Sequence, residues 1–271
     1  MARFENRLPP ENNVSPQHPL MEFSSLLAAV VVLVAVITAM LALGMHRLAD
    51  QIPLEWEQSM AQAWSDDLRQ ASPAQTALDG LLDDLVRADP LPEGMTARAT
   101  LIESEQINAF AGLGGEIIVH TGLVDAMRSE NGLALVLAHE LAHVRERHAL
   151  RQASRHLGIA LVGAFLLGES ANMAELAIAT TELGFSREQE MDADQRALEN
   201  VVRLYGHLGG TDVVFSLLGD DVFLSDWFST HPDLARRQRS VDAAIEQYGE
   251  GGETPLRPQW FERARPTSLA P

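Results

Sequence analysis

The sequence predicts a mainly α-helical fold with a small β element (α+β), preceded by one transmembrane helix. Three observations support this prediction: helical periodicity over most of the chain, two short β-like stretches, and one long apolar run near the amino terminus. The 271 residues suffice for an anchor and one domain of roughly 200 residues with a substantial core. The helical patterns cover 54–70, 73–89, 131–150, 171–184, 186–205 and 233–248.

The β-like stretches lie around 96–103 and 116–119, and Gly112, Gly114 and Gly115 interrupt the chain between them. Proline and polar residues at both ends of the chain indicate tails outside the folded part. We therefore expect five segments, which are a flexible tail (1–22), a transmembrane helix (23–45), a helical linker with the first helices of the domain (46–95), the main domain (96–248) and a C-terminal tail (249–271).

The apolar run from Phe23 to Met45 is long enough, as a helix, to cross about 30 Å of hydrocarbon. A signal peptide is the alternative, but this apolar stretch is too long for one and lies too far from the charged start of the chain. The residues around Gly44 resemble a cleavage site, so removal of the apolar segment stays an alternative to anchoring. A second apolar run, 157–167, is too short to span a bilayer and suggests a buried helix or a membrane-dipping hairpin.

The charges that flank the apolar run suggest an orientation. Arg3 and Arg7 precede it, whereas Arg47 alone follows it closely. Because positively charged flanks stay in the cytoplasm, we expect a single-pass membrane protein whose main domain lies outside the cytoplasm, on the periplasmic side.

Composition excludes several functions. The chain has no cysteine, which removes disulfides, thiol catalysis and cysteine-ligated zinc. Its net charge of −18 would repel a polyanion, so we expect no nucleic-acid partner.

A pair of histidines in the 131–150 helix forms a candidate metal site. His139 and His143 are one helical turn apart and therefore share a face, so two imidazoles can hold one zinc ion. Glu140, next to the first histidine, can then act as the general base toward an attacking water. His148 lies five positions after His143, which on a continuous helix is off the ligand face, so we interpret it as structural.

A later helix offers the missing ligand, because a catalytic zinc site uses three protein ligands and one open position. Glu190 and Asp194 are four residues apart and share a helical face. One of the two can bind zinc while the other accepts a hydrogen bond from a ligating histidine. Glu188 and Asp192 lie on another face, where we expect them to be solvated.

Four segments, taken in order, resemble motifs of the gluzincin metalloendopeptidase family related to HtpX, BepA and the CAAX prenyl endopeptidase (peptidase family M48). The chain has Leu113 where that family often has Pro, and Asp192 where it often has Glu, but neither is a proposed ligand. The segments are Asn108-Ala109-Phe110 with Gly114-Gly115-Glu116-Ile117-Ile118-Val119, His139 to His143, Ser186 to Asp194, and Thr230-His231-Pro232 with Arg237.

The resemblance implies a zincin-like metalloprotease domain over 96–248 with one Zn²⁺ per chain. It implies His139, His143 and Glu190 as metal ligands and Glu140 as the catalytic base. It also implies that His231 approaches the metal, where it either stabilises the oxyanion or fills the open position in a resting state. Asp194 and Arg237 are the residues expected to support the ligands from outside.

The resemblance further suggests that the strand from Gly115 to Val119 is an edge strand beside the metal. Such an edge can pair with an extended protein or peptide substrate, although an ordinary core strand fits the same pattern. The substrate-binding candidates are Asn108, Gly115, Ile117 and Val119.

Two functions fit these residues. The first is a membrane-anchored zinc endopeptidase that hydrolyses peptide bonds, in quality control of envelope or membrane proteins. The alternative is a chaperone-like assembly factor with a latent zinc site, in which His231 serves as a fourth ligand. A purely structural zinc site is disfavoured, because it has no use for Glu140.

Overall fold

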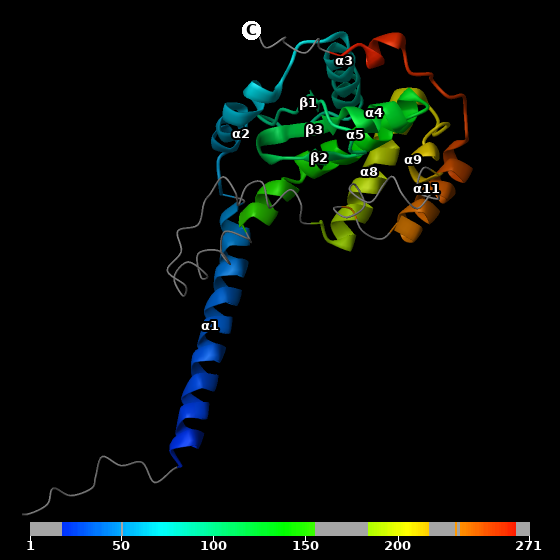
Figure 1. Cartoon of the computed structure of the whole chain (residues 1–271). Coiled ribbons are helices and arrows are strands. Elements are labelled where there is room, and N and C mark those ends of the chain that lie inside the picture. The colour runs from blue at the N-terminus through cyan, green and yellow to red at the C-terminus, as the bar shows by residue number, and fades with distance from the viewer. Residues whose placement is uncertain (1–17, 50, 155–183, 217–230, 232–233, 264–271) are drawn as a thin grey trace, which may run out of the picture.

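A computed structural model describes residues 18–49, 51–154, 184–216, 231 and 234–263 (Figure 1). The described part is mostly helical with one small sheet, so the predicted fold class is confirmed. Several predictions fall outside the described residues: most of the tail 1–22, the apolar run 157–167, nearly all of the helix 171–184, and Thr230 and Pro232 of the His231 motif.

The first helix, α1 (Pro19–Ala49), extends away from the rest of the molecule as a single rod (Figure 1). Within it, Pro19–Met40 is long and apolar enough to cross a membrane, and none of its most apolar window is buried. Two helices follow, α2 (Leu54–Leu68) and α3 (Pro73–Ala88), and α2 lies beside the sheet, above the upper end of α1 in Figure 1. Their bounds are within two residues of the predicted ones.

The sheet contains β1 (Arg98–Ile102), β2 (Ala109–Ala111) and β3 (Glu116–His120), in the order β1-β3-β2. β3 pairs in parallel with β1 and antiparallel with β2. The expectation that Gly115–Val119 is an edge strand is therefore wrong, because β3 is hydrogen-bonded on both sides. The edge strands of the described sheet are β1 and β2, and the Ala111 amide of β2 donates a hydrogen bond to Glu140.

A tight turn leads into β3. The 3₁₀ turn η1 (Leu113–Gly115) contains Gly114 with φ 66°, and a Cβ there would come within 2.6 Å of the Ala61 Cβ and of the Glu57 carbonyl oxygen. Both residues belong to α2, so glycine at this position lets α2 lie directly against the turn.

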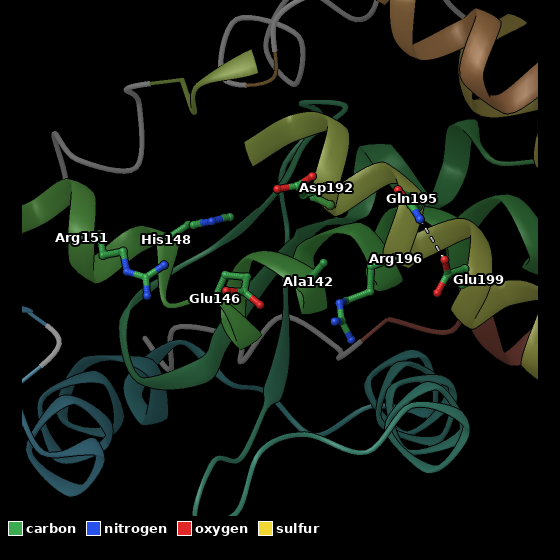
Figure 2. A pocket seen from close by; sticks show the side chains of 9 residues that line it. Ala142, Glu146, His148, Arg151, Asp192, Gln195, Arg196 and Glu199 are labelled. Carbon is green, nitrogen blue, oxygen red and sulfur yellow. Dashed lines mark hydrogen bonds between the residues drawn. The ribbon is translucent and has the colours of Figure 1, made fainter. Parts of the chain in front are cut away.

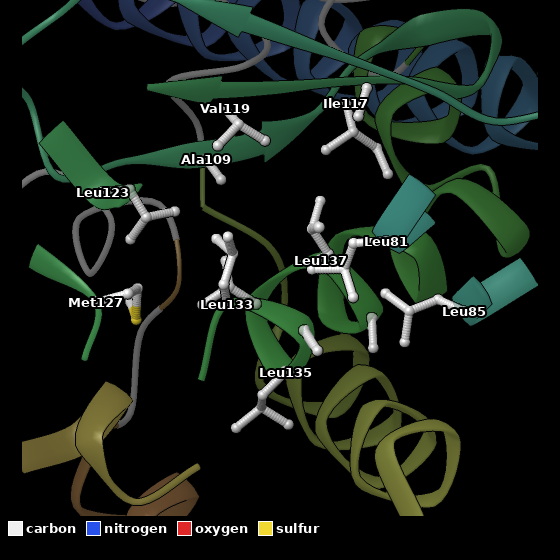
Figure 3. Close-up of a cluster of buried hydrophobic side chains, with 14 of the residues drawn as sticks. Leu81, Leu85, Ala109, Ile117, Val119, Leu123, Met127, Leu133, Leu135 and Leu137 are labelled. Atoms are coloured by element: carbon white, nitrogen blue, oxygen red, sulfur yellow. The ribbon is translucent and has the colours of Figure 1, made fainter. Parts of the chain in front are cut away.

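The centre of the domain is α5 (Glu130–Arg145), which follows the short helix α4 (Thr121–Ala126). Every residue of α5 from Glu130 to Val144 is buried. In Figure 3, Leu137 of α5 lies between Ile117 of β3 and the α3 residues Leu81 and Leu85. The opposite side of α5 packs against α8 (Arg187–Tyr205). Burial on both sides explains why Leu, Val and Ala residues occur on more than one face of α5.

The remaining elements close the domain. They are α9 (Val213–Ser216), α11 (Leu234–Tyr248) and the 3₁₀ turn η2 (Pro258–Phe261). Trp260 of η2 is 1% exposed, and its indole nitrogen donates to Glu130 at 3.3 Å. The described part of the predicted C-terminal tail thus contributes to the core, which Gly and Pro content alone does not reveal.

Candidate metal centre

The two candidate histidine ligands lie in the second half of α5. Ser129 caps this helix by accepting a hydrogen bond from the Gly132 amide. The cap fixes the first residue of α5 and so the helical face on which His139 and His143 lie. His139 and His143 are almost fully buried, and their Nε2 atoms are 3.0 Å apart. The helical period therefore aims both imidazoles at one point, as predicted.

The third candidate ligand comes from α8. A reciprocal capping box between Ser186 and Gln189 fixes the start of this helix. Glu190, in its first turn, is 1% exposed, with carboxylate oxygens 3.5 Å from the Nε2 of His139 and 3.4 Å from the Nε2 of His143. The exposed positions of Glu188 and Asp192 agree with the prediction that they are solvated.

His231 joins the same cluster. Its Nδ1 lies 3.0 Å from the Glu190 Oε1 and 3.2 Å from the His139 Nε2. One nitrogen or oxygen atom from each of His139, His143, Glu190 and His231 falls within 4.8 Å of the others, and all four residues are buried. Four converging donors of this kind can hold one metal ion.

Glu140 is held beside this cluster, not in it. One carboxylate oxygen accepts a hydrogen bond from the backbone amide of Ala111 in β2 at 2.8 Å, and the other lies 3.4 Å from the Nε2 of His231. The side chain is fully buried. A carboxylate in this position can accept a proton from a water molecule placed between it and the donor cluster.

Asp194 and Arg237 support His139 from behind. Asp194 lies 2.9 Å from the Nδ1 of His139, and Arg237 of α11 forms a two-pronged ion pair with Asp194, at 2.7 Å for each contact. Arg237 also approaches Glu190 at 3.2 Å. Burial opposes ionisation of Asp194, but hydrogen bonds from His139 and Arg237 outweigh it and lower its pKa to about 2.

The pKa values of the two candidate histidine ligands shift in opposite directions. Burial and the charge of Arg237 lower the pKa of His139, but hydrogen bonds to Asp194 and Glu190 prevail and raise it to about 9. Burial lowers the pKa of His143 well below its ordinary value. Burial would raise the pKa of Glu190, but hydrogen bonds from the surrounding histidines hold it far below the ordinary range.

Sequence reasoning missed two residues at this site. α5 ends at Arg145, and Arg147 adopts a left-handed conformation with φ 50°. This break returns His148 to the site, with its Nδ1 2.8 Å from the Nδ1 of His143. Phe185 stacks on the His143 ring with centroids 3.9 Å apart. The interpretation of His148 as off the ligand face assumed a continuous helix to residue 150, and that assumption is wrong.

The predicted substrate-binding residues occupy two different strands. Asn108 precedes β2, and its carbonyl accepts a hydrogen bond from the His120 amide at 3.0 Å. Ile117 and Val119 are fully buried in the central strand, and Gly115 is buried at its start. The backbone of β3 is thus engaged on both sides, and it is β2 that donates a backbone hydrogen bond to Glu140.

The donor cluster, the adjacent carboxylate and the crossing of α5 with α8 define a metallopeptidase type of centre. The chain belongs to peptidase family M48, whose family model matches residues 74–245.

Among its relatives, the beta-barrel assembly-enhancing protease of Escherichia coli O157:H7 is 33% identical over 117 residues, which are 38% of this chain and 24% of that protein. The mitochondrial metalloendopeptidase OMA1 of Arabidopsis thaliana is 27% identical over 170 residues, 56% of this chain and 32% of that protein. The metalloendopeptidase OMA1 of Bos taurus is 25% identical over 233 residues, 77% of this chain and 44% of that protein. The match therefore spans less than half the length of each relative.

Proposed function

We propose that this chain is a membrane-anchored, zinc-dependent metalloendopeptidase. The observation that carries the proposal is the buried convergence of His139, His143 and Glu190, with Glu140 held beside them by the Ala111 amide. Family M48 membership and relatives named as metalloendopeptidases support the same reaction class.

The donor set fits zinc. Two imidazoles and one carboxylate on two helices form the three-ligand arrangement of catalytic zinc sites, and borderline nitrogen and oxygen donors suit this ion. We assign His139, His143 and Glu190 as the ligands of one Zn²⁺ per chain. When bound, zinc polarises a peptide carbonyl and makes a water molecule more acidic.

The chain's own residues then have distinct roles. Glu140 accepts the proton of the attacking water and passes it to the leaving amine, because its carboxylate borders the cluster without belonging to it. Asp194 accepts a hydrogen bond from the Nδ1 of His139, which keeps the Nε2 of that ring available for the metal. Arg237 holds Asp194 in place through the two-pronged ion pair.

The substrate is proposed to bind along β2. Within the described part of the chain, β2 pairs only with β3, and its other edge faces Glu140. An extended peptide can add to that edge through its backbone. Asn108 supports this placement, because its side-chain oxygen is buried and accepts no hydrogen bond from a described residue. Gly115, Ile117 and Val119 would act indirectly, by holding β2 in position.

The anchor proposal rests on α1. Its apolar side chains face outward, with Leu33 58% exposed, and no other described part of the chain buries the most apolar stretch. Hydrocarbon is the solvent that such a surface needs. We place the catalytic domain outside the cytoplasm from the arginine bias, and we infer a role in quality control of envelope or membrane proteins from the name of the assembly-enhancing relative.

The catalytic proposal is tested with casein and the Glu140→Gln variant. After metal stripping and zinc return, we expect the wild type to regain activity and the variant to retain less than about a hundredth of it, because general-base catalysis contributes 10²–10⁴-fold. Glu188→Gln, an exposed site on α8, is the matched control and should keep full activity. Full activity of Glu140→Gln would refute the assignment.

Anchoring is tested with Leu33→Arg. A charge at the centre of a spanning helix opposes insertion by about 3 kcal/mol, so this variant should leave the membrane fraction more readily under alkaline extraction. Wild-type chain that is fully soluble without detergent would contradict the anchor.

One observation favours the alternative of a chaperone-like assembly factor with a latent site. His231 lies among the ligand atoms, so it can fill the position that a substrate needs. If it closes the site, His231→Ala should raise peptidase activity; if it stabilises the oxyanion, the same variant should lower kcat. Client binding without peptidase activity, even in His231→Ala, would favour the alternative.

A further inference from the structure

The two histidine ligands receive different support from behind. The Nδ1 of His139 meets the carboxylate of Asp194, whereas the Nδ1 of His143 meets the Nδ1 of His148 at 2.8 Å. We propose that His148 is a positioning residue that holds His143 in the tautomer able to bind the metal. This inference rests on the proposed zinc site and adds a residue to it.

The contact between the two rings constrains their protons. Two Nδ1 atoms at hydrogen-bond distance require that one carries hydrogen and the other presents a lone pair. The Nε2 of His143 points into the donor cluster, so its lone pair is needed there and its hydrogen belongs on Nδ1. His148 must then accept at Nδ1, which makes it a neutral imidazole with hydrogen on Nε2.

The surroundings hold both rings in this geometry. His148 is 5% exposed, and Phe185 stacks on the other ring, that of His143, with an interplanar angle of 18°. A ring packed in this way cannot rotate to find another partner. The contact with His148 therefore sets both the orientation and the tautomer of the ligand.

The position of His148 depends on the turn after α5. Arg147 is left-handed there, which costs a non-glycine residue free energy, and other contacts must hold it in place. Its guanidinium contacts Glu57 of α2 at 2.9 and 2.8 Å and donates to the Ile52 carbonyl at 2.8 Å. Glu57 is 6% exposed and also accepts from the Gly114 amide at 2.9 Å.

A chain of contacts thus joins α2, the first helix after the apolar helix α1, to a metal ligand. Glu57 holds Arg147, the turn at Arg147 places His148, and His148 orients His143. The same Glu57 holds the turn before β3. We infer that the docking of α2 sets the geometry of the metal centre and not merely the stability of the domain.

Substitution at position 148 is sterically feasible. A polar pocket of about 440 Å³ opens beside His148, between α5 and α8 (Figure 2). Its walls carry charges of both signs, so the pocket itself indicates no particular ligand; the charged members are Glu146, Arg151, Asp192, Arg196 and Glu199. A smaller side chain at 148 therefore faces open space on one side.

The test compares His148→Leu with His148→Asn in the full chain in detergent, using zinc affinity measured by competition with a chromophoric chelator. The Asn oxygen sits where the His148 Nδ1 lies and can accept from His143, whereas Leu cannot. Loss of a partner behind a metal ligand typically costs 10–100-fold in metal affinity. We expect a loss of about 10–100-fold for His148→Leu, and for His148→Asn an affinity within about threefold of wild type.

Nitrogen-15 imidazole spectra of the zinc-loaded wild type report which nitrogen of each ring carries hydrogen, and a purely structural role of His148 would not require a particular answer. They should show hydrogen on the Nδ1 of His143 and on the Nε2 of His148. Unchanged zinc affinity in His148→Leu, equal losses in both variants, or the opposite tautomer of His148 would overturn the proposal. None of these readouts depends on peptidase activity, so an inactive wild type that binds zinc would refute the proposed function alone.

The link to α2 is tested with Glu57→Gln against Glu55→Gln, an exposed position on the same helix. We expect Glu57→Gln to lower zinc affinity by about tenfold and Glu55→Gln to leave it unchanged. Equal affinities would show that the Arg147 contact does not govern the site. If Glu57→Gln proves too unstable to purify, Arg147→Ala replaces it: alanine lacks the guanidinium contacts but still pays for the left-handed turn, so retained affinity would again overturn the link.

Discussion

Helices α1 and α5 are both rich in Leu, Val and Ala, yet their polar side chains are satisfied in different ways. In α1, the hydroxyls of Ser24, Ser25 and Thr38 donate to backbone carbonyls of the same helix, at 2.8–2.9 Å. In α5, Glu140 and His139 depend on Ala111 in the sheet and Asp194 in α8. A helix whose polar groups are satisfied internally suits lipid, whereas one that needs partners from other elements suits a protein interior.

The comparison teaches where function resides in this chain. The contacts described for the metal centre involve no residue of α1. They do involve α5, because each polar residue in it is matched to a partner elsewhere in the fold.

Arg237→Met should have the largest effect on stability. It removes the guanidinium that faces the buried carboxylates of Asp194 and Glu190 and leaves them only the charged ring of His139, and breaking a buried pair in this way costs about 3–5 kcal/mol. Urea unfolding of the metal-free protein measures this change. Arg236→Met, an exposed neighbour on α11, is the control and should stay within about 0.5 kcal/mol of wild type. A loss below 1 kcal/mol in Arg237→Met would mean that the pair is not buried as described.

Leu137→Ala should destabilise the domain by about 2–5 kcal/mol. Its side chain is fully buried between the sheet and α3, and the substitution removes apolar contacts and leaves a cavity (Figure 3). Thermal unfolding followed by far-UV circular dichroism provides the measurement. An unchanged midpoint would show that α5 does not form the centre of the core.

Zinc binding should release a proton over a defined pH range. The pKa of His139 is raised to about 9 in the metal-free site, so the ring is charged at neutral pH and must lose its proton to bind zinc. Apparent zinc affinity should therefore rise about tenfold per pH unit, about 1.4 kcal/mol, up to pH 9 and then level off. Calorimetry in buffers of different ionisation enthalpy counts the released protons. A flat pH profile between 7 and 9 would contradict the raised pKa.

Leu33→Ala in α1 should have the smallest effect on the catalytic domain. This side chain is exposed and does not pack on the catalytic domain, so its truncation should change the unfolding free energy of the domain by less than about 0.5 kcal/mol. The same Leu-to-Ala change at Leu137 serves as the matched comparison. A large loss at Leu33 would mean that α1 packs on the domain, which would break the contrast between the two helices.

Much of the site could be predicted from within single elements. His139, Glu140 and His143 follow from the period of one helix, and so do Glu190 and Asp194 on the next. The apolar helix α1 could be predicted from the composition and length of its segment alone. What failed were expectations about pairing and continuity, namely that residues 115–119 form an edge strand and that one helix continues to residue 150.

These failures share a physical cause. A period of 3.6 or 2 residues determines which side chains share a face, but not which neighbour that face meets. Strand order depends on how β2 folds back along β3, and Arg147 at the break contacts Glu57, 90 residues earlier in the chain.

By itself, then, the sequence determined which residues are candidate ligands, the helices that carry them, the mainly helical class and the apolar helix α1. Only the tertiary structure decided that Arg237 pairs with Asp194, that β2 provides the edge beside Glu140, and that His148 turns back to His143. The reason is that periodicity depends on residues close in the sequence, whereas contacts between elements form only when α2, α5, α8 and α11 pack together.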